Sequence, residues 1–111
     1  METRDYLHDQ IQKIARLITA LLSKRKVEDD AVEQALSDLT GIDPSFFRGT
    51  SEAVLTAMVN TLDDVDKRAL IALLLYAQAP EQYSRLREGV LASISVEKLN
   101  PKIKAIIETQ F

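Results

Sequence analysis

The amino-acid sequence predicts an all-α fold for a single domain that spans residues 1–111. Hydrophobic residues make up 46% of the chain, which is enough for one core at this length. Three glycines and three prolines occur, too few turn residues for the many short strands of an all-β domain. Apolar residues also recur at intervals of three and four, which places them on one face of a helix.

The first expected helix covers residues 4–25. Its apolar face is broad, so we expect it to contact two neighbouring helices, or one neighbour and a second chain. The cations of residues 24–26 are expected in its last turn, where they would offset the negative end of the helix dipole. The residues that share the apolar face are Leu7, Ile11, Ile14, Ala15, Ile18 and Leu22.

The second expected helix begins after Asp29 or Asp30 and ends before Gly41. With Asp30 as the cap, Glu33 falls at the third helical position and completes a pair that resembles a capping box. Gly41 is expected to be left-handed, with Ile42 as the hydrophobic contact of a Schellman motif. The short polar connection between the first two helices predicts that they form an antiparallel hairpin.

Two shorter elements are expected next. Asp43 and Pro44 resemble the cap and the first position of one short helical turn, which Gly49 ends. Thr50 or Ser51 is expected to cap the helix that follows. Three aspartates within residues 63–66 are expected at the start of the next helix, because carboxylates favour the positive end of its dipole.

Residues 69–77 have no polar face, which is typical of a helix at the centre of a bundle. Pro80 is expected to end this helix and can equally begin the next one, which covers residues 81–94. A terminal helix is expected from Asn100 and Pro101 onward. The sequence therefore predicts about six helices in antiparallel hairpins.

The turn residues and the apolar pattern agree, because all three prolines and two of the three glycines fall at expected boundaries. Gly89 is the exception, since it lies inside an expected helix. It either permits a close contact between two helices or costs about 1 kcal/mol relative to alanine.

The net charge of −3 is unevenly distributed along the chain. Residues 1–27 carry +3 and residues 67–111 carry +3, whereas residues 28–66 carry −9. This acidic middle segment either packs against the basic ends or offers a surface to a basic partner, and the sequence leaves both possibilities open.

The sequence offers no motif for catalysis, for a cofactor or for a metal ion. Cysteine is absent, and the three isolated glycines form no phosphate-binding loop. Asp5, His8 and Asp9 share one expected helical turn, but bundle metal sites usually take ligands from facing helices, and His8 is the single histidine. We therefore predict no catalytic, cofactor-binding or metal-ligating residues, which weighs against an enzyme without deciding the question.

The expected location is the cytoplasm. The longest uncharged apolar stretch, residues 69–80, is shorter than the ~20 residues that a membrane-spanning helix needs, so no membrane association is expected. No signal peptide follows Met1, and the lack of cysteine fits a reducing compartment.

Basic residues near the C-terminus raise the possibility of nucleic-acid binding. The acidic net charge weighs against it, because a nucleic-acid interface is normally strongly basic, and the solvated side of amphipathic helices explains these residues as well. They are Arg85, Arg87, Lys98, Lys102 and Lys104.

Several segments of the N-terminal half share the pattern of one known family. They are Arg4-Asp5-Tyr6-Leu7, Gln10-Ile11, Ile14-Ala15-Arg16, Leu21-Leu22, Ala31-Val32-Glu33-Gln34-Ala35-Leu36 and Thr40-Gly41-Ile42-Asp43. Over about residues 4–62 the chain resembles a family of small bacterial helical proteins of unknown function that are described as tetratricopeptide-like. Residues 65–111 depart from a 34-residue tetratricopeptide pattern.

This resemblance implies helical hairpins stacked into a small array, and it supplies no site residues. The fold expected from all observations is therefore a tetratricopeptide-like array or an orthogonal helical bundle. The function expected is a non-enzymatic protein–protein interaction domain whose partner is another protein or a second copy of the chain. The alternative is a nucleic-acid-associated helical domain that uses the basic C-terminal residues.

Overall fold

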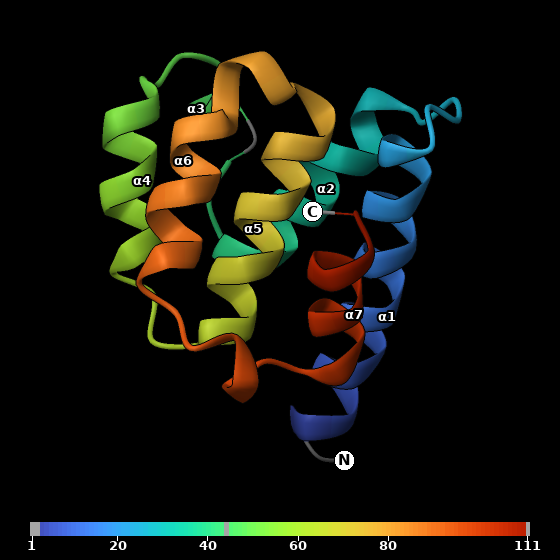
Figure 1. Cartoon of the computed structure of the whole chain (residues 1–111). Coiled ribbons are helices and arrows are strands. Elements are labelled where there is room, and N and C mark those ends of the chain that lie inside the picture. Colours follow the sequence, from blue (N-terminus) through green and yellow to red (C-terminus); the bar gives the residue numbers. More distant parts are fainter. Residues whose placement is uncertain (1–2, 44, 111) are drawn as a thin grey trace.

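The computed structural model describes residues 3–43 and 45–110, which form seven α-helices, one 3₁₀ turn and no strand (Figure 1). This confirms the all-α prediction. The elements are α1 (Thr3–Leu22), α2 (Asp29–Thr40), α3 (Ser45–Arg48), α4 (Glu52–Asn60), α5 (Val65–Gln78), α6 (Pro80–Ala92), the 3₁₀ turn η1 (Val96–Lys98) and α7 (Pro101–Gln110).

Helix α5 lies at the centre of the molecule, as its apolar sequence predicts (Figure 1). Each side chain of residues 69–75 is at most 1% exposed. Helices α1, α2, α4, α6 and α7 all pack against α5. In a stacked array each hairpin contacts its neighbours in the sequence, whereas here one helix is shared by elements from the whole chain. Of the two arrangements that the sequence allows, the structure has the bundle.

The expected helix starts are confirmed in the second half of the chain. The Asp64 carboxylate caps α5 by accepting from the backbone amides two and three residues further on, at 2.8 and 3.2 Å. Ser51, rather than Thr50, caps α4. Pro80 stands at the first position of α6, and the Asn100 side chain accepts from a backbone amide in the first turn of α7.

The end of α1 differs from the prediction. The helix stops at Leu22 and not at Arg25, so the cations of residues 24–26 lie in the connection and not in the last turn. Lys24 takes the left-handed conformation with φ 61°, and the flanking amides complete a Schellman motif: Lys24 N–H donates to Leu21 O at 3.0 Å, and Arg25 N–H donates to Ala20 O at 2.9 Å. Sequence reasoning missed this stop because no glycine marks it.

Helix α2 also begins differently. It starts at Asp29 with Glu28 as its cap residue, so the predicted capping pair of Asp30 and Glu33 is wrong. The helix ends before Gly41 and Gly41 is left-handed with φ 74°, and both features agree with the prediction. The single bond from Gly41 N–H to Ser37 O at 2.7 Å makes this the simpler left-handed motif and not a Schellman motif. The predicted role of Pro44 lies outside the described residues.

A kink divides α6 and is bridged from α4. Tyr83 has non-helical angles of φ −112° and ψ 17°, so the helix restarts after it. In the first turn of this second part, Leu86 N–H donates to the Glu52 carboxylate of α4 at 3.0 Å. A carboxylate at the start of a helical segment is favoured by the dipole, so Glu52 ties α4 to α6 at the kink.

The Lys24→Gly variant tests the strained end of α1. Glycine adopts the left-handed conformation without the Cβ clash that lysine suffers, so we expect the free energy of unfolding to rise by about 0.5–1 kcal/mol. Urea unfolding followed by circular dichroism measures the change. Lys24→Ala is the matched control, because it removes the charge but keeps Cβ, and equal stabilisation by both variants would contradict the explanation.

The Gly89→Ala variant decides between the two explanations of this glycine. A Cβ at Gly89 would lie 3.5 Å from Thr56 Cγ2, which is an ordinary contact, so the α4–α6 packing leaves room for alanine. We expect stabilisation by about 0.5–1 kcal/mol from the better helix propensity. Gly41→Ala should instead destabilise the protein, because Gly41 has φ 74°. Thermal unfolding of the two variants measures these changes in stability, which should have opposite signs.

Ionisation of the Tyr83 phenol is expected to make the free energy of unfolding depend on pH in the alkaline range. Burial, and secondarily the Glu52 carboxylate, raise the pKa of Tyr83 above its ordinary value of 10.0. The unfolded chain therefore loses this proton first, so the contribution of Tyr83 is complete below pH 10.0 and is lost as the pH rises toward the folded pKa. Urea unfolding at a series of pH values above 9 measures the free energy of unfolding. This free energy should fall less steeply with pH in Tyr83→Phe than in the parent. Equal dependence on pH in the two proteins would show that Tyr83 is not responsible.

Candidate binding groove between α1 and α2

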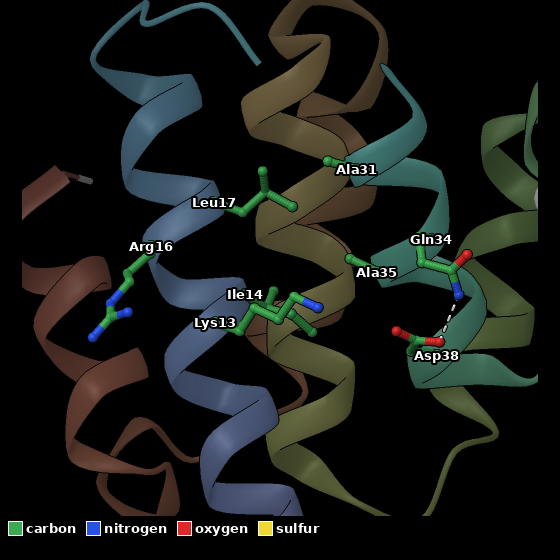
Figure 2. Close-up of a pocket in the computed structure, with 8 residues that line it drawn as sticks. All are labelled: Lys13, Ile14, Arg16, Leu17, Ala31, Gln34, Ala35 and Asp38. Atoms are coloured by element: carbon green, nitrogen blue, oxygen red, sulfur yellow. Dashed lines mark hydrogen bonds between the residues drawn. The ribbon is translucent and has the colours of Figure 1, made fainter. Parts of the chain in front are cut away.

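Helices α1 and α2 run antiparallel, as predicted, but a groove separates them (Figure 2). The groove encloses about 460 Å³, and α5 lies behind it. Both helices pack against α5 more extensively than against each other. The residues that line the groove are Lys13, Ile14, Arg16, Leu17, Ala31, Gln34, Ala35 and Asp38.

The local sequence explains why the groove is not filled. On α2 the positions that face α1 include Ala31 and Ala35, one helical turn apart, and their methyl groups leave space between the helices (Figure 2). On α1 the apolar lining is Ile14, which is 2% exposed, and Leu17, which is half-buried. The interior of the groove is therefore apolar and comes from four side chains of two helices.

Polar side chains stand at the end of the groove nearer the N-terminal half of α1. Gln34 Nε2 donates to Asp38 Oδ1 at 2.8 Å, so these two α2 residues form one hydrogen-bonded pair. Lys13 extends from α1 toward α2, whereas Arg16 points the other way, toward α7 (Figure 2). The groove thus has an apolar end at Leu17 and a polar end at which a cation and a carboxylate stand on opposite walls.

A second, more open groove lies on the other side of α1, between α1 and α7. It encloses about 470 Å³. Its lining residues are Gln12, Ala15, Arg16, Thr19, Arg25, Lys102, Ala105 and Ile106. Helix α1 therefore separates two grooves of different chemistry, in keeping with the broad apolar face that its sequence predicts.

The residues considered for metal binding, and the aspartates near the start of α5, have other surroundings. The side chains of Asp5 and His8 lie outside the described residues, and Asp9 is exposed. No group of three or more potential metal ligands occurs among the described side chains. Of the aspartates near the start of α5, Asp64 is the cap, and Asp66 Oδ1 accepts from Asn100 N–H at 2.8 Å, which joins α5 to α7.

Acids of the segment 28–66 are used repeatedly as acceptors for backbone amides. Asp43 accepts from the Ser45 amide at the start of α3, and Asp64 caps α5. Glu52 and Asp66 accept from α6 and from the residue before α7. The sequence left open whether this segment packs against the basic ends or forms a binding surface, and it predicted helix starts for some of its aspartates. In the structure, Asp43, Glu52, Asp64 and Asp66 accept from backbone amides.

The basic residues considered for nucleic-acid binding lie in different places. Arg85 is exposed on α6. The Arg87 guanidinium lies 4.5 Å from the centre of the Tyr76 ring, a cation–π contact. Lys102 lines the groove between α1 and α7, as Arg16 does.

A scan against protein-family models, a search of the curated proteins and a search of the solved structures found no match to this chain. The resemblance of residues 4–62 to the tetratricopeptide-like family therefore stays a prediction. Within the described part of the chain, no helix combines the length and the apolar character needed to cross a membrane.

Proposed function

We propose that this chain is a non-enzymatic helical interaction domain that binds an amphipathic helix of a partner protein in the groove between α1 and α2. The observation that carries the proposal is the apolar interior of this groove, held open between two helices that are fixed by their common contact with α5. Recognition of a helix by a groove relies on such an interior. The absence of cysteine supports a cytoplasmic setting.

The volume of the groove supports binding of a few side chains from a partner helix rather than enclosure of the whole helix. A volume of about 460 Å³ holds several apolar side chains. Ala31 and Ala35 present so little bulk that a partner helix could approach α2 closely. Such a partner would place apolar residues at intervals of three and four along the groove, which is the pattern of an amphipathic helix.

The opposite charges on the two walls at the polar end of the groove favour a partner helix with matching charges on its two sides. Lys13 stands on the α1 wall and Asp38 on the α2 wall. A partner with a carboxylate on the side facing α1, and a neutral or basic group on the side facing α2, would match both walls. Mismatched charges at the same place would weaken binding, so the pair would contribute to specificity.

A selection of displayed helical peptides against the protein tests the proposal. Peptides that bind should carry apolar residues with helical spacing, and Ala31→Leu should weaken their binding at least about tenfold, because the leucine occupies the groove and excludes one anchor. Fluorescence anisotropy with the selected peptides measures the affinity. Ala53→Leu is the matched control, since Ala53 is an exposed helical alanine on α4, away from the groove.

Two outcomes would count against the proposal. Peptides that bind the parent and Ala31→Leu equally well do not use this groove. A concentration-dependent dimer in sedimentation, abolished by Ala31→Leu, would instead assign the groove to a second copy of the chain.

A further inference from the structure

The groove between α1 and α7 gathers positive charge. Arg16 on α1, Arg25 in the connection after α1 and Lys102 at the start of α7 all line it, and none of its described lining residues is a carboxylate. All three side chains are exposed, and none has a hydrogen-bond or ion-pair partner among the described residues. Three cations in the lining of one groove are unusual in a chain whose net charge is −3.

The fold places Lys102 of α7 along the same groove as Arg16 and Arg25 from α1 and the connection after it. Helices α1 and α7 lie side by side (Figure 1) and pack against each other. Arg16 points toward α7 and away from the groove on the other side of α1 (Figure 2). The left-handed turn at Lys24 fixes the backbone of Arg25 against the end of α1, where its N–H bonds to Ala20 O.

The remaining lining has a different character. Ala15, Ala105 and Ile106 contribute apolar surface, and Ile106 is 8% exposed. Gln12 and Thr19 add polar side chains, of which the Thr19 hydroxyl donates to Ala15 O at 2.9 Å. The groove therefore offers cations together with an apolar surface a few residues away, which is the combination that an organic anion requires.

We infer that this groove binds a small organic phosphate, with the phosphate among Arg16, Arg25 and Lys102 and the organic part on the apolar lining. Guanidinium groups bind phosphate oxygens through paired hydrogen bonds, and a lysine adds a point charge. A long polyanion such as nucleic acid fits less well. It would extend beyond three cations, and a segment of the same chain carries −9.

Calorimetric and NMR titrations of the full chain with pyrophosphate and with adenosine diphosphate, at about 50 mM salt, test the inference. Both probes should bind, and shifted amide signals should come from α1 and α7. Arg16→Gln and Lys102→Gln should each weaken binding at least about fivefold, because each removes one charged contact. Arg16→Lys should fall between the parent and Arg16→Gln, since it keeps the charge and loses the paired geometry.

Arg85→Gln is the matched control, because Arg85 is an exposed arginine on α6, outside the groove. It should leave both affinities unchanged, and an equal loss in this variant would overturn the location of the site. Tighter binding of the nucleotide than of pyrophosphate is expected, and equal affinity would overturn the role of the apolar lining.

Other ligands separate the alternatives. A glutamate-rich peptide that binds as tightly as pyrophosphate would overturn the preference for phosphate, and an oligonucleotide that binds more tightly than adenosine diphosphate would assign the groove to nucleic acid. No binding of any probe would refute the inference. Ala31→Leu alters the groove between α1 and α2 and should leave nucleotide binding unchanged. The phosphate-binding inference and the proposed helix-binding function can therefore be refuted independently of each other.

Discussion

Residues 69–77 of α5 have no polar face, so each side of this part of the helix must be covered by another element of the chain. Five helices do so, and this requirement arranges the rest of the molecule. Helices α1 and α2 are adjacent in sequence and would be expected to pack directly on each other. Both instead pack against α5, and the short side chains of Ala31 and Ala35 do not fill the space between them, so a groove remains. The candidate site is thus a consequence of covering the core.

Polar contacts fix the covering helices in place. Glu52 of α4 accepts from an amide of α6 at the kink near Tyr83, and Asp66 of α5 accepts from the residue before α7. Each contact spans 34 positions in the sequence and satisfies a backbone amide near the start of a helical segment. Carboxylates are well suited to this task because the helix dipole favours negative charge there. Part of the acidity of the chain is therefore explained by its architecture.

The two grooves on either side of α1 differ because their second walls differ. Helix α2 supplies small apolar residues and a hydrogen-bonded Gln34–Asp38 pair, whereas α7 supplies Lys102 with Ala105 and Ile106. Arg16 lines both grooves but is directed toward α7. Helix α1 thus forms one wall of both grooves, for which we propose an amphipathic helix and a small organic phosphate as the ligands.

The sequence by itself determined the helical class, the central position of residues 69–77, and most boundaries, because local physics sets these features. Pro80 and Gly41 act on their own turns, and Asp64 caps the helix that it precedes. The end of α1 was not predicted correctly, because the left-handed residue there is Lys24 and no glycine or other local signal marks it. Only the tertiary structure decided which helices share α5, where Ala31 faces α1, and that Arg25 and Lys102 line one groove. These are contacts between distant residues, and periodicity fixes the face of a helix but not the neighbour that the face meets.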